Sequence, residues 1–123
     1  MKDTYLSRSF RHREFICKCR RSTCSAPPMN MQFINKLQAL RDLWGKALVV
    51  NSGSRCALWN IACGGTPYSQ HLLGLAADLH LDNPADGPKL ASLAEKVQLG
   101  GIGISLNFIH LDDGPAGRRW TYP

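Results

Sequence analysis

Three side chains in the second half of the chain have the types and the spacing of a metal site. The segment His71-Leu-Leu-Gly-Leu-Ala-Ala-Asp78 is followed by Phe108-Ile-His110-Leu-Asp112. Two imidazoles and a carboxylate suit Zn²⁺, whereas an oxygen-only set suits Mg²⁺ or Ca²⁺. Catalytic zinc sites use three protein side chains and leave a further position open for water or substrate. His71, Asp78 and His110 therefore predict a catalytic zinc site, although two surface histidines on a sheet would give the same spacing.

The period of a β-strand brings two of these side chains within reach of each other. Successive residues of a strand face opposite sides of a sheet, which fixes the side of Asp78 in the segment 77–82 and of His110 in the segment 108–112. If the two strands are neighbours, Asp78 and His110 converge on one ion. The apolar residues between them then fill the core: these are Leu79, Leu81, Ile109 and Leu111.

The elements that must position these residues follow from periodicity, glycine and proline. Apolar residues at helical offsets predict a helix from Asn30 to Trp44, which Gly45 ends. Shorter patterns predict strands at 46–50, 75–81, 102–104 and 108–112, and helices at 58–63 and 88–98. This order predicts an α+β fold, in which helices flank a small antiparallel sheet that carries the zinc site on its face.

Length and composition indicate one domain. We expect residues 1–123 to form a single unit, with residues 1–28 as an irregular basic lead-in that ends at a double proline. No apolar run approaches the roughly 20 residues that span a bilayer, and the start of the chain has no apolar stretch typical of a secretory signal. We therefore expect synthesis in the cytoplasm, no membrane insertion and a monomer.

The net charge of +6 points to an anionic partner or to a solvated basic surface. Basic residues gather in the lead-in and near the C-terminus, where Arg118 and Arg119 stand together. No helix-turn-helix, RNA-binding aromatic signature or zinc-finger spacing accompanies the charge. Nucleic acid is therefore not favoured as a partner.

Cysteine usage argues against a disulfide framework, because the count is odd and no signal sequence is visible. The five cysteines are Cys17, Cys19, Cys24, Cys56 and Cys63. Cys17, Cys19 and Cys24, with His12 as a candidate fourth ligand, could belong to a structural zinc knuckle. The group lacks the usual paired C-x2-4-C spacing, so thiols without a metal are favoured. Cys56 and Cys63 are a candidate pair in an oxidising compartment.

Three ordered blocks of the sequence resemble the zinc peptidases that cut bacterial peptidoglycan stem peptides. The blocks are Ser52-Gly-Ser-Arg-Cys56, Gly64-Gly-Thr-Pro-Tyr-Ser69-Gln-His71-Leu-Leu-Gly74-Leu-Ala76-Ala-Asp78 and Phe108-Ile-His110-Leu-Asp112. This group includes D-Ala-D-Ala carboxypeptidases and phage L-alanyl-D-glutamate endolysins. The chain is most similar to the short single-domain branch, which has a hedgehog-like fold, and the resemblance covers nearly the whole chain.

The resemblance implies roles for individual residues. It implies zinc ligands at His71, Asp78 and His110, an Arg55 that faces the substrate, and a Ser69 that helps to shape the site. A guanidinium at Arg55 can hold a substrate carboxylate or stabilise an oxyanion, whereas a surface salt bridge is the alternative interpretation. Ser69 could equally form a turn by bonding its own backbone.

The general base departs from the pattern of the group. Several relatives have an acidic residue or a histidine three positions before the last ligand, where this chain has Asn107, which cannot titrate. Asp112 is the candidate catalytic carboxylate, with Asp113 and His80 as less favoured candidates. Asp112 could instead orient a metal-binding imidazole, which is a common arrangement at zinc sites.

The resemblance implies a zinc-dependent peptidase that hydrolyses an amide bond in peptidoglycan stem peptides or crosslinks. Endolysin-like and carboxypeptidase-like action both fit the residues. Peptidoglycan is then the partner and Zn²⁺ the cofactor, and the enzyme would reach the cell wall after release from the cytoplasm, in the host periplasm or exterior if phage-encoded. The alternative hypothesis is a non-catalytic wall-binding or phage structural module that retains the fold and the zinc, which Asn107 favours.

Overall fold

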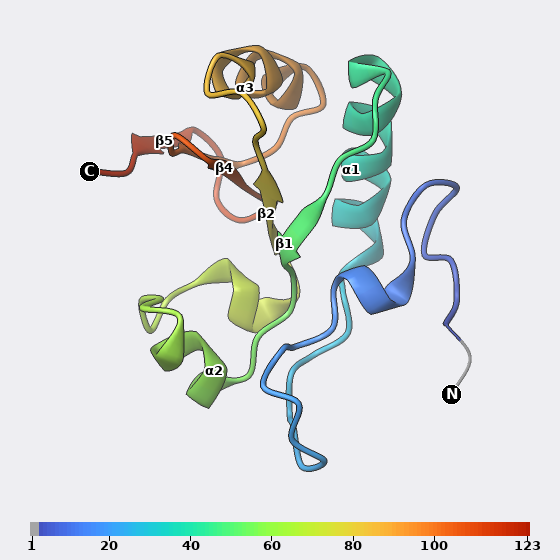
Figure 1. Cartoon of the computed structure of the whole chain (residues 1–123), viewed down its shortest axis with the longest axis vertical. Coiled ribbons are helices and arrows are strands. Elements are labelled where there is room, and N and C mark those ends of the chain that lie inside the picture. The colour runs from blue at the N-terminus through green and yellow to red at the C-terminus, as the bar shows by residue number, and fades with distance from the viewer. Residues whose placement is uncertain (1–2) are drawn as a thin grey trace.

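The computed structural model describes residues 3–123, which form one five-stranded sheet with helices on both sides (Figure 1). The α-helices are α1 (Met31–Trp44), α2 (Ala57–Ala62) and α3 (Asp86–Lys96), and two short 3-10 helices are η1 (His12–Glu14) and η2 (Gln70–Leu73). The strands are β1 (Val50–Ser52), β2 (Ala76–His80), β3 (Gly101–Ile104), β4 (Phe108–Asp112) and β5 (Arg118–Thr121). The structure confirms the α+β class.

The strands lie in the order β1-β2-β4-β3-β5, so the two strands of the metal motif are neighbours. β2 and β4 are antiparallel, and Asp78 lies directly opposite His110. The next pair in this ladder is Leu79 with Ile109, and both side chains are fully buried. The alternation of the two strands therefore turns the polar pair to one face and the apolar pair to the other.

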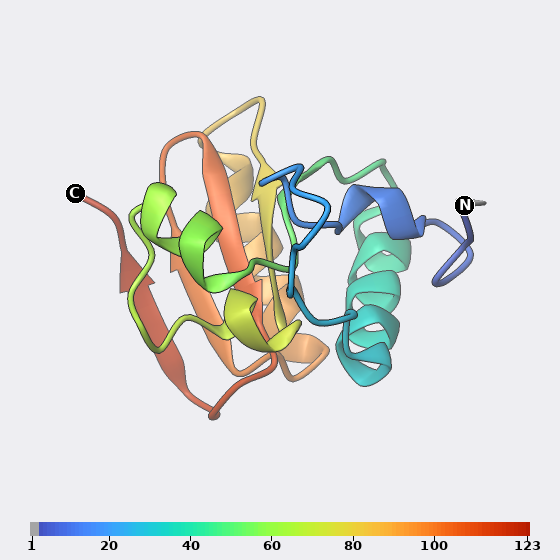
Figure 2. The ribbon, with the colours of Figure 1, turned by 90° about the horizontal axis from the view of Figure 1, so that it is seen from below.

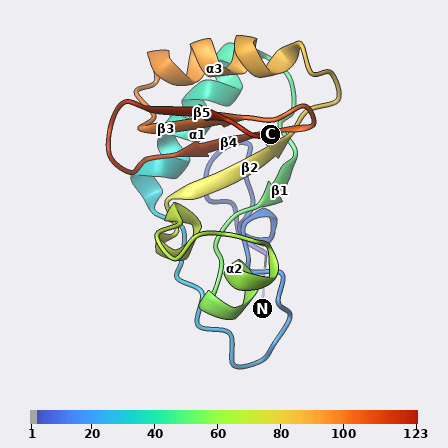
Figure 3. The same ribbon diagram turned by 90° about the vertical axis from the view of Figure 1, so that its left-hand side faces the viewer.

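α1 and α3 cover the apolar face of the sheet. Their buried residues Leu37 and Leu90 join one core with Leu79, Ile109 and Ile102 of the strands. Figure 3 shows the sheet nearly edge-on, with α3 on one side and α2 on the other. The face that carries Asp78 and His110 is thus left to α2 and η2.

The long helix α1 begins and ends where its sequence requires. The side chain of Asn30 accepts a hydrogen bond from the backbone N–H of Phe33, which satisfies one of the free donors of the first turn. Gly45 ends the helix with φ of 76°, in the left-handed region that favours glycine. The helix from 30 to 44 is therefore confirmed to within one residue.

The lead-in contains the short helix η1 and packs against the rest of the domain. Phe10 and Phe15 are buried in the core and their rings meet edge to face, with centroids 5.7 Å apart. Ser7 and Ser9 bond to the side chain of Gln38 on α1. Figure 2 shows this N-terminal segment running alongside α1.

Two strand predictions need correction. The predicted strand at 46–50 is wrong at its start, because β1 covers only Val50–Ser52 and Val49 is exposed on the edge of the sheet. An apolar run without pairing partners on both sides does not form a central strand. The last strand, β5, was not predicted, and it pairs with β3 in parallel rather than antiparallel fashion.

Within residues 3–123, none of the helices combines the length and the apolar character needed to cross a bilayer.

Candidate metal centre

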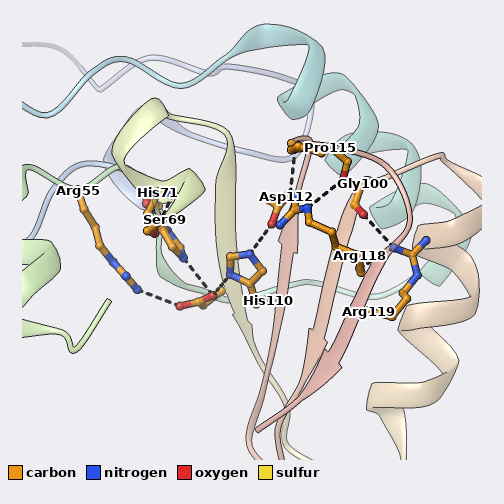
Figure 4. Close-up of polar contacts among 12 residues, drawn as sticks. Arg55, Ser69, His71, Gly100, His110, Asp112, Pro115, Arg118 and Arg119 are labelled. Carbon is orange, nitrogen blue, oxygen red and sulfur yellow. Dashed lines mark hydrogen bonds and ion pairs between the residues drawn. The ribbon is translucent and has the colours of Figure 1, made fainter. Parts of the chain in front are cut away.

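Three separate elements bring His71, Asp78 and His110 together. Asp78 and His110 come from the paired strands β2 and β4, and His71 comes from η2. Ser69 precedes η2, and its hydroxyl accepts a hydrogen bond from the backbone N–H of His71. The ligand atoms of His71, Asp78 and His110 all lie within 4.8 Å of one another. Figure 4 shows the two imidazoles turned toward each other.

One nitrogen of the His71 ring is held by the backbone. Nδ1 lies 2.7 Å from the carbonyl oxygen of Gly53, and because a carbonyl only accepts, Nδ1 carries the proton. The other nitrogen, Nε2, lies 3.2 Å from Oδ1 of Asp78. In the neutral ring, the lone pair of Nε2 therefore points at the carboxylate.

The His110 ring is held in the same way by a side chain. Its Nε2 lies 2.7 Å from Oδ2 of Asp112, and its Nδ1 lies 2.9 Å from Oδ1 of Asp78. The carboxylate of Asp112 accepts, so Nε2 carries a proton. Nδ1 donates to Asp78 when the ring is charged, and it has a lone pair for a metal when the ring is neutral. In the neutral rings, the lone pairs of both inner nitrogens are directed at one carboxylate oxygen, an arrangement that a cation between them makes favourable. This donor set fits a zinc ion.

The electrostatics of the site favour an ionised Asp78. Burial alone raises the pKa of Asp78, but the hydrogen bonds of His110 and His71 outweigh burial and hold the pKa below its ordinary value. Arg55 contributes from the other side, because its Nη2 lies 3.1 Å from Oδ2 of Asp78. Asp78 therefore offers a negative oxygen to the centre while its second oxygen is tied to a cation.

Arg55 is held firmly beside the centre. Arg55 is only 8% exposed. Besides its bond to Asp78, its guanidinium donates to Oδ1 of Asn60 and to Oγ of Ser52. A surface salt bridge, the alternative interpretation from the sequence, does not describe this residue. Arg55 instead bridges Asp78 of the sheet and Asn60 of α2, and it is one of the residues that line the pocket.

Asp112 lies beneath His110 and is completely buried. Besides His110, it accepts hydrogen bonds from the backbone N–H of Gly114, at 2.9 Å, and from Nη2 of Arg118. Burial raises the pKa of Asp112, but the bonds from His110 and Arg118 outweigh it and lower the pKa below its ordinary value. A side chain at Gly101 would collide with this carboxylate, which explains the glycine on the neighbouring strand.

An open pocket lies over the metal centre. Mostly aromatic or basic side chains from β4, β5, η2 and the segments beside them form its walls. Members of this wall are Tyr68, Gln70, Phe108, Arg118, Trp120 and Tyr122. Within the described chain, the only carboxylates that line this pocket are Asp78 and Asp112. Ligands with their own negative charge would match such a lining.

The less favoured candidates for the base lie outside this pocket. Asp113 binds Nζ of Lys36 at 2.7 Å, and His80 binds Oδ1 of Asp82 at 2.9 Å. Asn107 is exposed, and its carbonyl oxygen accepts from the backbone N–H of Leu81. None of these three side chains lines the pocket.

The sequence interpretation missed the contribution of β5. Trp120 stacks against His110 with ring centroids 5.2 Å apart, and Arg118 binds Asp112. The signal was the alternation in Arg118-Arg-Trp120-Thr, which places Arg118 and Trp120 on one face of a strand. Arg119 faces the other way, where it meets Glu95 of α3.

Fold and site together define the class of protein: an α+β domain with a metal-binding His/Asp/His group on one face of its sheet. The chain belongs to the peptidase M15 family, because the family model described as Peptidase M15 matches residues 8–112. This finding confirms the resemblance, and it identifies the chain as a member of a family of zinc metallopeptidases that act on peptidoglycan. No curated protein sequence matches the chain.

Proposed function

We propose that this protein hydrolyses an amide bond in peptidoglycan stem peptides or crosslinks, with zinc held by His71, Asp78 and His110. The observation that carries this proposal is the locked orientation of the two imidazoles. Gly53 and Asp112 hold the outer nitrogens as donors, so the inner nitrogens meet at Asp78. Zinc in such a site supplies Lewis-acid chemistry, in that it polarises a carbonyl and makes water nucleophilic near neutral pH.

The protein's own residues would bind and orient the substrate around that centre. Arg55 lies against Asp78, where it can stabilise negative charge that develops on the carbonyl oxygen of the cleaved bond. Ser69 fixes the turn that presents His71. We propose that Asp112 acts as a positioning residue that keeps the proton on Nε2 of His110, which is the second of the two roles considered for it.

The pocket lining supports a substrate with free carboxylates. Arg118 reaches the pocket while its guanidinium binds Asp112, and its side chain is 36% exposed. A guanidinium can pair with a substrate carboxylate, and stem peptides carry such groups. Trp120 and Tyr122 provide apolar surface for the peptide beside it. An endolysin-like role, in which the protein reaches the wall after release from the cytoplasm, is the form of this function that we propose.

A non-catalytic wall-binding module is the second candidate. The specific observation in its favour is that both carboxylates lining the pocket are already engaged, Asp78 with two imidazoles and Arg55, and Asp112 with three donors. Neither is free to carry a proton between water and a leaving amine. Such a module would sediment with cell walls and release no new amino groups.

Digestion of purified cell walls separates the two candidates. Mass spectrometry of the soluble muropeptides would identify the cleaved bond, and chelator treatment should abolish its appearance. His71→Ala should be inactive, whereas His80→Ala, which changes a half-exposed histidine outside the pocket, should retain activity. Wall binding without any new amino group in the wild type would support the binding module and overturn the hydrolase.

A further inference from the structure

A second cluster of metal-binding side chains lies away from the histidine centre. Cys17, Cys19 and Cys24 of the lead-in meet Cys56, which directly precedes α2. Their four sulfur atoms all lie within 4.8 Å of one another, and all four are free thiols. These four residues are called the cysteine cluster below. Cys63, the candidate partner of Cys56 in the sequence, is exposed and lies outside it.

The spacing of the sulfur atoms matches a single ion. Zinc binds thiolate sulfur at about 2.3 Å in a tetrahedral arrangement, which places two sulfur ligands about 3.8 Å apart. Sγ of Cys17 and Sγ of Cys56 are 3.8 Å apart. Four thiolates form a soft, closed ligand set, which selects zinc or iron over magnesium or calcium.

Hydrogen-bond donors from the backbone and from Arg21 are directed at sulfur atoms of the cluster. The backbone N–H groups of Ala26 and Cys56 point at Sγ of Cys24 and Sγ of Cys17, at 3.5 Å and 3.4 Å. The guanidinium of Arg21 lies 3.7 Å from Sγ of Cys56. Donors directed at sulfur and a nearby cation offset part of the negative charge that four thiolates carry.

The pKa values of the cluster's thiols are shifted in both directions. The backbone N–H of Trp59 is the main cause that lowers the pKa of Cys56 to about 6, and Arg21 acts in the same direction against the effect of burial. The backbone N–H of Arg21 likewise lowers the pKa of Cys19 below its ordinary value. The backbone N–H of Ala26 lowers the pKa of Cys24, but the neighbouring thiols of Cys19 and Cys17, together with burial, outweigh it and raise that pKa to about 11. The positions of the four sulfur atoms, and not their acidity, therefore carry the case for a metal site.

We propose that the cysteine cluster binds one structural zinc ion, in addition to the ion of the His71, Asp78 and His110 centre. The cluster has no open protein-ligand position, because four cysteines complete a tetrahedral shell. The spacing rule misses it in the sequence because the first two cysteines are separated by one residue only, and the fourth ligand, Cys56, comes from another part of the chain rather than from His12.

This ion would fasten the lead-in to the loop that supports the other metal centre. Cys56 follows Arg55, which binds Asp78. In the same loop, Gly53 accepts from His71, and a side chain on Gly53 would come within 2.6 Å of the backbone of Phe15. The backbone N–H of Ser54 donates to Phe15 at 2.8 Å. Loss of the cluster's ion should therefore loosen the loop that orients His71 and Arg55.

Metal analysis of matched variants tests the proposal without any activity measurement. Protein purified under reducing conditions would be assayed for zinc per chain in the wild type, His71→Ala, Cys19→Ser and Cys63→Ser. We expect two equivalents in the wild type and in Cys63→Ser, one in His71→Ala and one in Cys19→Ser. A His71→Ala chain that binds no zinc would overturn the proposal, while leaving the proposed peptidase intact.

Cobalt substitution covers the case in which Cys19→Ser fails to fold. Co²⁺ loaded into wild-type protein should show the intense near-ultraviolet charge-transfer absorption of cobalt thiolate, and His71→Ala should keep it. Absence of this absorption would overturn the proposal. Alkylation after denaturation under non-reducing conditions gives a second check, because five modified cysteines support a metal–thiolate site and fewer indicate disulfides instead.

Discussion

Replacement of Asp112 by asparagine tests how the structure fixes the metal-binding imidazole. The carboxylate accepts from Nε2 of His110 at 2.7 Å, from the backbone N–H of Gly114 at 2.9 Å and from Arg118. The amide of asparagine has one accepting oxygen, and this oxygen is held by the donors of Gly114 and Arg118, which both bond to Oδ1 of Asp112. The NH₂ group of the substituted side chain then faces His110, whose Nε2 must accept and whose proton must move to Nδ1.

That change removes the lone pair which His110 presents to the metal. Loss of a residue that orients a metal-binding imidazole typically lowers metal affinity by a factor of about 10 to 100. This factor corresponds to about 1.4–2.7 kcal/mol of binding free energy. We expect an effect at the upper end of this range for Asp112→Asn, because the site is buried and the tautomer, and not only the ring angle, is wrong.

Competitive titration with a chromogenic chelator measures the zinc affinity of the histidine centre. The wild type and the variant carry the same cysteine cluster, so the difference between their titration curves reports on the histidine centre. Asp113→Asn is the matched control, because Asp113 binds Lys36 outside the pocket and should leave the affinity unchanged. An Asp112→Asn protein with unchanged zinc affinity and reduced hydrolysis would refute this reasoning, and would assign Asp112 to proton transfer instead.

Three further perturbations have defined outcomes. Gly103→Ala places a Cβ against the Trp120 ring. We therefore expect a shift in tryptophan fluorescence and a loss of about 1–3 kcal/mol in the free energy of unfolding. An unchanged fluorescence spectrum would contradict this packing. Asn30→Ala removes the side-chain bond to the N–H of Phe33 and should lower the free energy of unfolding by about 1 kcal/mol in denaturant titration; no change would show the cap to be dispensable. Burial lowers the pKa of His110, but its two carboxylate partners outweigh burial and raise the pKa above its ordinary value. Protons therefore compete with zinc for His110 as the pH falls through the neutral range, and the amount of zinc that a chelator removes should rise there. Zinc that stays bound down into acidic solution would contradict the shift.

The sequence was sufficient for the central part of the fold. The alternation around Asp78 and His110 predicted that these residues would converge if their strands were neighbours, and the strand order and register show that the strands are neighbours, with the two residues opposite each other. The helix from Asn30 was also predictable, because its cap and its terminal glycine are local signals. The period of the apolar residues predicts a helix or strand where one face of the element packs on the core and the other does not.

What the sequence could not provide depends on contacts between distant segments. The tautomers of the two histidines depend on the carbonyl of Gly53 and on Asp112, and no spacing rule links Gly53 to His71. The parallel pairing of β5 with β3 is equally non-local. The same is true of Cys56, which joins three cysteines from the lead-in only after the chain has folded back on itself.

Anomalous diffraction at the zinc edge from crystals of the wild-type protein is the most direct test of the histidine centre. We predict a peak bonded to Nε2 of His71, Nδ1 of His110 and the carboxylate of Asp78, with zinc–nitrogen distances of about 2.0–2.1 Å. Nδ1 of His71 should remain on the carbonyl oxygen of Gly53. A zinc-loaded crystal with no anomalous peak at these three side chains, or with zinc bound through Nδ1 of His71, would contradict the proposed metal centre.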